Sequence, residues 1–192
     1  QLWGFTTGDF AVPSKEDLAA KLALVNAGRI SLTEDNGVSS ITLPEGMEID
    51  LGGIAKGYTS GRVMEVMKRY GIESAVINLG GNAHVLGSKP DGSAWKVGIQ
   101  DPNDTNGYLG GVSVRDKAII TSGGYERYFE KDGVTYHHII DPSTGYSAEN
   151  GLISVTIVSA DGTLADGLST SLFVMGKDKA ISYWKEHSKE FN

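Results

Sequence analysis

The sequence predicts an α+β domain in which helices pack against mixed or antiparallel sheets. Its 192 residues, 40% of them hydrophobic, are enough for one domain with a sizeable core. Short strand-like segments follow one another in runs, whereas a parallel α/β fold would alternate them strictly with helices. No internal repeat, low-complexity segment or linker divides the chain, so we expect residues 1–192 to form a single domain.

Four segments have the apolar spacing or the flanking residues of helices. In the second of them we expect Val63, Val66 and Met67 to be buried and Gly71 to end the helix. The four predicted helices are residues 14–26, 54–70, 160–175 and 177–187.

Strands are predicted where short apolar segments end at turn-forming residues. Two of the turns, Asp35-Asn36-Gly37 and Lys131-Asp132-Gly133, are typical of hairpins. The predicted strands are residues 29–33, 38–43, 74–79, 85–87, 95–100, 109–114, 118–121, 125–130, 134–138 and 153–158.

Charge and composition exclude several classes of protein. The net charge of −7 argues against a nucleic-acid surface, which would show a basic face. The absence of cysteine excludes disulfides, thiolate zinc sites and a cysteine nucleophile. No segment approaches the roughly 18 apolar residues of a membrane-spanning helix. The apolar start at Gln1-Leu2-Trp3 and the helix-like end lead us to expect a fragment truncated at both ends.

A glycine-rich turn, Asp50-Leu51-Gly52-Gly53-Ile54-Ala55-Lys56-Gly57, precedes the second predicted helix. The first N–H groups of a helix have no intrahelical partner and lie at the positive end of its dipole, so they can bind an anion. Lys56 adds a positive charge and Asp50 a carboxylate. This pattern favours a phosphate ligand, but an ordinary strand-to-helix turn with glycines for packing explains it equally well.

Two further stretches carry polar groups suited to a nucleotide site. Thr121-Ser122-Gly123 places hydroxyls after a strand, where they could contact phosphate or ribose, although a plain turn fits as well. His137 and His138 lie in a segment that we read as extended, so their side chains should point to opposite faces. A histidine can act as a general base near neutral pH, but it can also be structural.

Asp166 and Thr170 are four residues apart and share one face of the third predicted helix. A carboxylate and a hydroxyl are hard oxygen ligands, which suit Mg²⁺ better than zinc. The alternative is that Asp166 caps the N-terminus of a buried helix.

Taken together and in this order, these stretches resemble the ApbE family of flavin transferases. The resemblance covers essentially the whole chain, and several motifs in a fixed order are far more specific than any one of them. The matching stretches are residues 2–5, 50–57, 78–82, 95–102, 121–123, 138–142 and 165–170.

The resemblance implies an ApbE-like fold related to the T-fold, and it implies binding of FAD and Mg²⁺. Many such proteins transfer FMN from FAD to a threonine hydroxyl of a partner protein and release AMP. Some relatives hydrolyse FAD to FMN and AMP, and a carrier that stores FAD without turnover is a further alternative. The expected partners are subunits of membrane redox complexes. The expected location is extracytoplasmic, periplasmic or cell-surface, with a lipid anchor outside this chain.

The resemblance also assigns site residues. It implies that the Asp166 carboxylate, the Thr170 hydroxyl and the Gly53 carbonyl bind the metal, and it leaves a ligand role for Ser169 open. His138, rather than His137, matches the family histidine and would take the proton from the attacking hydroxyl, or would orient a carboxylate that does so. Asp166 and His138 are thus the expected catalytic residues. Flavin-nucleotide contacts are expected from Asp50, Lys56, Gly80, Gly81, Asn82, Thr121, Ser122, Gly123 and His138.

Overall fold

The computed structural model describes residues 2–192, which form two compact units, each made of two stretches of chain. The first unit comprises the residues up to Asp50 together with Arg127–Ser147. The second comprises Leu51–Glu126 and Ala148–Asn192. Most of the residues predicted for a metal and phosphate site belong to the second unit.

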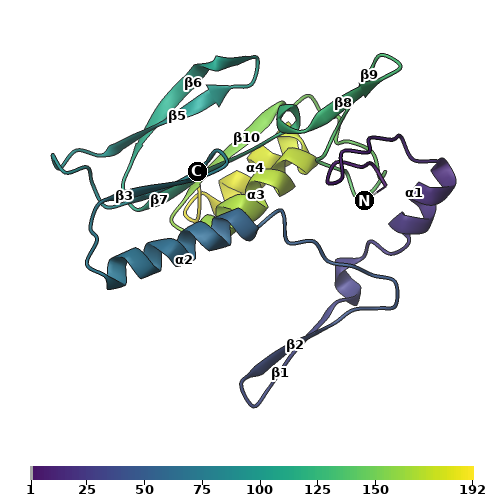
Figure 1. The fold of residues 1–192 in the computed structure, drawn as a ribbon, viewed down its shortest axis with the longest axis horizontal. Coiled ribbons are helices and arrows are strands. Elements are labelled where there is room, and N and C mark those ends of the chain that lie inside the picture. Colours follow the sequence, from purple (N-terminus) through teal and green to yellow (C-terminus); the bar gives the residue numbers. More distant parts are fainter. Residues whose placement is uncertain (1) are drawn as a thin grey trace. The chain divides into compact units, whose positions relative to one another are not determined.

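The second unit is built on a four-stranded antiparallel sheet (Figure 1). Its strand order is β10-β7-β4-β3, so the first two strands in the sequence, β3 and β4, form a hairpin at one edge. The strands are β3 (Ala75–Leu79), β4 (Asn82–Leu86), β7 (Lys117–Gly123) and β10 (Ser154–Ser159).

The β3–β4 hairpin turns over only two residues. Leu79 pairs with Asn82, which leaves Gly80 and Gly81 as the loop. Their φ angles are 57° and 92°, and a two-residue hairpin loop with positive φ at both positions favours glycine because it has no Cβ to clash. The turn therefore fixes Asn82 as the first residue of β4.

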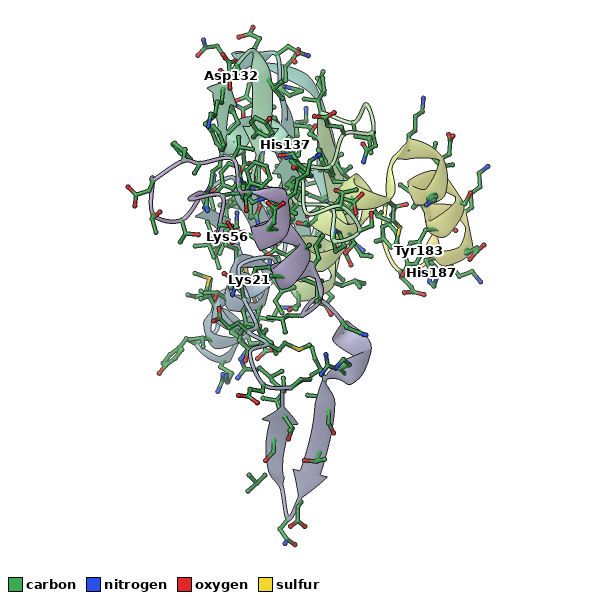
Figure 2. The ribbon with its side chains drawn as sticks, turned by 90° about the vertical axis from the view of Figure 1, so that its right-hand side faces the viewer. Lys21, Lys56, Asp132, His137, Tyr183 and His187 are labelled. Carbon is green, nitrogen blue, oxygen red and sulfur yellow. The ribbon has the colours of Figure 1, made fainter. Side chains whose placement is uncertain are left out.

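Three helices belong to this unit: α2 (Ala55–Arg69), α3 (Gly162–Met175) and α4 (Lys177–His187). α3 packs against β7 and β10, while α2 and α4 pack against α3. The core between α3 and the sheet contains Ala118, Ile120, Ile157, Ala165, Leu168, Leu172 and Phe191. At the end of α4 the rings of Tyr183 and His187 stack with their centroids 4.3 Å apart (Figure 2).

The buried face of α2 differs from our prediction. Val63 and Val66 are exposed and Met67 is only half-buried, whereas Gly57, Ser60 and Met64 are buried. The reason is the contact with α3. A Cβ on Gly57 would overlap the Gly162 carbonyl oxygen, so the two helices meet through small residues and not through the valine face.

A hairpin of β5 (Trp95–Asp101) and β6 (Asp104–Val114) forms a separate two-stranded sheet in the second unit. Its register shifts twice between Ile99 and Asp101, the signature of a β-bulge. A short 3₁₀ helix, η2 (Gly124–Glu126), follows β7. Our predicted strand over residues 125–130 is thus wrong at its start, because Tyr125 belongs to this helical turn.

The first unit contains α1 (Lys15–Leu22), the 3₁₀ helix η1 (Ala27–Arg29) and two hairpins. The hairpins are β1 (Ser31–Asp35) with β2 (Val38–Thr42), and β8 (Tyr128–Lys131) with β9 (Val134–His137). α1 ends four residues before the predicted boundary, because Asn26 caps η1 with its side chain and redirects the chain.

An aromatic cluster holds the first unit together. The Trp3 ring lies against Phe5, Phe129, Tyr136 and Tyr146, with centroids 5.2–6.3 Å apart. Its indole N–H donates to the Gly145 carbonyl at 3.0 Å. Among the residues that the structure describes, no helix combines the length and hydropathy required to cross a bilayer.

Candidate metal and nucleotide site

The Asp166 carboxylate lies at the junction of three elements in the second unit. It comes from the second turn of α3 and is 4% exposed. Its Oδ2 accepts a hydrogen bond from the backbone N–H of Gly57 at 2.8 Å, and its Oδ1 accepts one from Asn82 Nδ2 at 3.3 Å. The α2 start and the first residue of β4 therefore both hold this one side chain.

Asp166 caps a helix, but not its own. Asp161 is the N-cap of α3 and accepts from the N–H groups of Thr163 and Leu164. The N-cap residue of α2, Ile54, has no side chain that can accept such a bond. Asp166 supplies the missing acceptor at the first turn of α2, where a negative charge is also favoured by the helix dipole. Asp166 is therefore a capping acid, as the alternative reading held, but it caps α2 and not its own helix α3.

A chain of hydroxyl groups lies close to Asp166 in sequence and in structure. Ser169 Oγ donates to the Asp166 carbonyl at 2.9 Å. Ser122 Oγ lies 2.8 Å from Ser169 Oγ and 2.9 Å from Thr170 Oγ1. Each hydroxyl has one proton, so Ser122 must donate to Ser169, and Thr170 must donate to Ser122. The lone pairs of Thr170 Oγ1 therefore stay available for another ligand.

These groups fit a hard cation. Asp166 takes no part in the salt bridges Arg62–Glu65 and His187–Glu190, and no cationic side chain among the described residues forms an ion pair with it. A buried carboxylate without such compensation is costly. The described residues contain no cluster of three or more histidine, cysteine, aspartate or glutamate side chains. One carboxylate with hydroxyl and carbonyl oxygens matches Mg²⁺, which usually keeps several waters.

The remaining predicted residues of the second unit lie on the elements that surround Asp166. Lys56 is half-buried in the first turn of α2, and Gly53, which precedes that helix, is exposed. Gly80 and Gly81 form the exposed hairpin loop that precedes Asn82.

The β7 residues take part in contacts that the sequence did not reveal. The Thr121 hydroxyl bonds to Thr156 across the sheet at 2.8 Å. Gly123 lies against the Tyr125 ring, which leaves no room for a Cβ. Ser122 contacts the α3 hydroxyls, a link that no local pattern in the sequence indicates.

His138 belongs to the first unit. It lies one residue beyond β9, and its N–H donates to the Arg127 carbonyl at 3.1 Å. Its Nδ1 lies 3.2 Å from the same oxygen. A carbonyl oxygen can only accept, so Nδ1 carries the proton and Nε2 is the basic nitrogen of the neutral ring. The His137 ring makes a different contact, since its Nδ1 accepts from the Ile139 N–H at 3.3 Å.

Asp50 also belongs to the first unit, where it lines a cavity of about 530 Å³. No sequence pattern indicates this cavity, because its walls come from segments far apart in the chain. Its lining is mainly apolar and includes Trp3, Leu18, Leu22, Leu24, Ile30 and Ile140.

His84 is a buried polar residue of the second unit that the sequence analysis missed. Its Nδ1 lies 3.0 Å from Ser60 Oγ, on the buried face of α2, and its side chain is 6% exposed. Burial lowers the pKa of His84, and the charge of Lys68 lowers that pKa further, while Asp116 and Asp161 act in the opposite direction. His84 also lines a cavity of about 440 Å³ beside α2 and the start of α3.

The sequence of this chain is similar to those of known proteins. The family model described as the ApbE family matches residues 1–192. A protein from Klebsiella pneumoniae (strain 342) named FAD:protein FMN transferase is 40% identical over 183 residues, which are 95% of this chain and 56% of that relative. A Treponema pallidum protein of the same name is 37% identical over 97% of this chain and 55% of its own length. The chain thus spans about half the length of these curated relatives.

Solved structures show the same fold. The ApbE protein of Thermotoga maritima superposes with a TM-score of 0.88 at 38% identity, over 97% of this chain and 61% of that one. The flavin transferase ApbE from Vibrio cholerae gives a TM-score of 0.80 at 34% identity, over 97% and 59% of the two chains. These matches confirm the predicted α+β class with antiparallel sheets and packed helices. Because the family model matches the whole length of this chain, the chain belongs to the ApbE family.

Proposed function

We propose that this chain is the part of an FAD:protein FMN transferase that holds Mg²⁺ and the phosphates of FAD. The product would be a phosphoester between FMN and a threonine hydroxyl of a partner protein, with release of AMP. The names of the relatives support the flavin substrate and the transfer. Mg²⁺ dependence and the threonine acceptor follow from the resemblance of the motifs and from the chemistry of the site.

The buried Asp166 carboxylate is the observation that carries the proposal. It has no cationic partner among the described residues, and each of its oxygens accepts one hydrogen bond, which leaves lone pairs for a cation. Asp166, the Thr170 hydroxyl and the Gly53 carbonyl would hold Mg²⁺. When bound, Mg²⁺ supplies a Lewis acid that stabilises negative charge on phosphate oxygens.

The chain's own groups would bind and orient the nucleotide. Lys56 would attract the pyrophosphate beside the first turn of α2, where the helix dipole favours an anion. The backbone of the Gly80-Gly81 loop and the hydroxyls of β7 are further candidates for contacts with the nucleotide.

In the proposed reaction the threonine oxygen forms a bond to the FMN-side phosphorus of FAD. The P–O bond to AMP breaks, and AMP leaves with the electron pair of that bond. The hydroxyl proton passes to His138 Nε2, the nitrogen that the Arg127 carbonyl leaves unprotonated. Positioned proton transfer of this kind typically contributes about two to four decades of rate.

Incubation of the full-length protein with FAD and Mg²⁺, with and without a threonine-bearing acceptor peptide, tests the proposal. We expect FMN covalently on the peptide and AMP in solution, both dependent on Mg²⁺. If AMP and free FMN form at the same rate without the peptide, the reaction is hydrolysis of FAD and not transfer. Intact FAD in every tube would show that the protein is a flavin carrier and not an enzyme acting on FAD.

We further propose that the acceptor is a subunit of a membrane redox complex and that the protein works outside the cytoplasm, anchored by a lipid. This proposal follows from the family resemblance alone. Protease treatment of intact cells, compared with lysed cells, tests the location. Protection in intact cells from which any outer membrane has been stripped would contradict it.

A further inference from the structure

The hydrogen bond between Asn82 and Asp166 permits only one orientation of the Asn82 amide. A carboxylate only accepts hydrogen bonds, so the NH₂ group and not the oxygen of Asn82 must face Asp166 Oδ1. Asn82 is 3% exposed. The amide is therefore committed to an interior contact.

The backbone around Asn82 is rigid. The residue opens β4 directly after the two-glycine loop, and β4 is paired on both sides, with β3 and with β7. Because Asn82 pairs with Leu79, the position of the Asn82 side chain on the sheet is fixed. A side chain mounted on a central strand can hold a partner more precisely than one on a loop.

Without Asn82, only one of the two carboxylate oxygens of Asp166 would keep its hydrogen-bond donor. The Gly57 N–H holds Oδ2. The Asn82 amide holds Oδ1, so the two donors together fix the rotation of the carboxylate about its χ2 bond. A carboxylate that binds a metal is held in the required orientation by its hydrogen-bond donors. Loss of such a donor typically weakens metal affinity by about 10–100-fold.

We propose that Asn82 is a positioning residue for the metal site, which acts through Asp166 and does not contact the nucleotide. This inference rests on the metal role proposed for Asp166. It differs from the expectation drawn from the motif, which assigned Asn82 to the flavin nucleotide. The carboxylate orientation set by Asn82 determines how well Asp166 meets a cation.

Replacing Asn82 in the full-length protein tests this assignment. Asn82→Leu keeps the branching of the side chain at Cγ and removes the N–H donors. We expect the Kd for Mn²⁺, measured from the electron paramagnetic resonance signal of free Mn²⁺ without FAD, to rise by about 10–100-fold. We also expect the Mg²⁺ concentration for half-maximal turnover to rise in parallel, while the KM for FAD at saturating Mg²⁺ stays unchanged. Asn82→Ser, whose hydroxyl is too short to reach Asp166, gives the same test if the leucine variant fails to fold.

Asn150→Ala is the matched control, because Asn150 anchors the other end of α3. Its Nδ2 donates to the Phe173 carbonyl at 2.6 Å, far along the helix from Asp166. This variant should unfold more easily and still bind Mn²⁺ like the wild type. A loss of Mn²⁺ affinity in both variants would mean that any loosening of α3 is enough, and would overturn the specific role of Asn82.

Two other results separate this inference from the proposed function. Wild-type Mn²⁺ affinity in Asn82→Leu, with a raised KM for FAD, would place Asn82 at the nucleotide and leave the transferase proposal intact. Wild-type Mn²⁺ affinity in Asp166→Asn would remove Asp166 from the metal site, and the metal part of the proposed function would fail with the positioning role.

Discussion

The Asp166 side chain combines two tasks that a substitution can separate. As a carboxylate it is the proposed anionic ligand, and as an acceptor it caps α2 through Gly57. Removing the acceptor leaves a buried N–H without a partner, which costs about 1–3 kcal/mol. Removing only the charge can leave the cap in place. A test of the ligand role alone therefore needs a variant that keeps the hydrogen bond.

Asp166→Asn should lose Mg²⁺-dependent turnover by roughly two to four decades, at ~1.4 kcal/mol per decade, and keep nearly the wild-type free energy of unfolding. An asparagine oxygen can still accept from Gly57, and the Asn82 amide can rotate to offer its oxygen. Asp166→Ala should lose turnover and also about 1–3 kcal/mol of stability. Urea unfolding and initial rates at saturating FAD measure both. Near-normal turnover in the asparagine variant would exclude the carboxylate as a ligand.

The two adjacent histidines make a second prediction at the scale of single residues. His138→Ala should lose two to four decades of turnover while FAD binding persists, because the proposed base is gone. His137→Ala should stay within a few-fold of the wild type, since its ring makes a local contact with the Ile139 N–H.

The pH profile of turnover distinguishes the roles of the two rings. The acidic limb should disappear in the His138 variant alone if its imidazole is the base. Equal loss in both variants would point to damage of the β8–β9 hairpin. A His138→Ala profile that retains its acidic limb would favour a carboxylate base that His138 orients.

At the scale of secondary structure, the packing of α2 on α3 depends on glycines. A Cβ at Gly57 would overlap the Gly162 carbonyl oxygen and approach the Asp166 Cβ to 2.7 Å. In the opposite direction, a Cβ at Gly162 would lie 2.7 Å from the Gly57 carbonyl oxygen. The helices therefore approach too closely for any side chain at either position.

Gly57→Ala should destabilise the protein by at least about 1–3 kcal/mol, because the helices must separate to admit the methyl group. Gly61→Ala, one turn later in α2, is its control. Nothing lies within 4 Å of a Cβ there, so alanine should stabilise the helix by about 0.5–1 kcal/mol. Denaturant unfolding of both variants gives the comparison. Equal stability changes of the same sign would contradict the close contact between α2 and α3.

At the scale of the whole molecule, buried His84 should make stability depend on pH. Its pKa in the folded protein is lowered from 6.5, first by burial and then by Lys68. The unfolded chain therefore binds the proton more readily. The contribution of neutral His84 to the free energy of unfolding is fully present above pH 6.5. It is lost as the pH falls towards and through the lowered pKa.

His84→Gln should therefore flatten the loss of stability as the pH falls below 6.5, whatever its stability at neutral pH. Urea unfolding across this range in the variant and the wild type measures the difference. Proton NMR titration of the His84 ring gives the pKa directly. A pKa at or above 6.5, or an unchanged slope in the variant, would contradict the assignment.

The sequence predicted most elements of the fold because their signals are local. Asn36 and Gly37 have φ angles of 49° and 78°, as a two-residue hairpin loop requires, and Asn-Gly is typical of this turn. The boundaries of α4 agree with the predicted helix over residues 177–187. Errors occurred where a neighbouring side chain altered the path, as at Asn26, which ends the first helix early.

The sequence by itself determined the family, the antiparallel α+β class and the identity of the candidate ligands, since ordered motifs and turn residues are properties of short stretches of chain. Only the tertiary structure decided what those ligands contact. Gly57 and Asn82 reach Asp166 across 109 and 84 residues of sequence, and the buried face of α2 is the glycine face and not the valine face. Periodicity shows which side chains are apolar, but burial and hydrogen bonding depend on how closely two backbones approach, and the small residues that allow that approach carry no apolar signal.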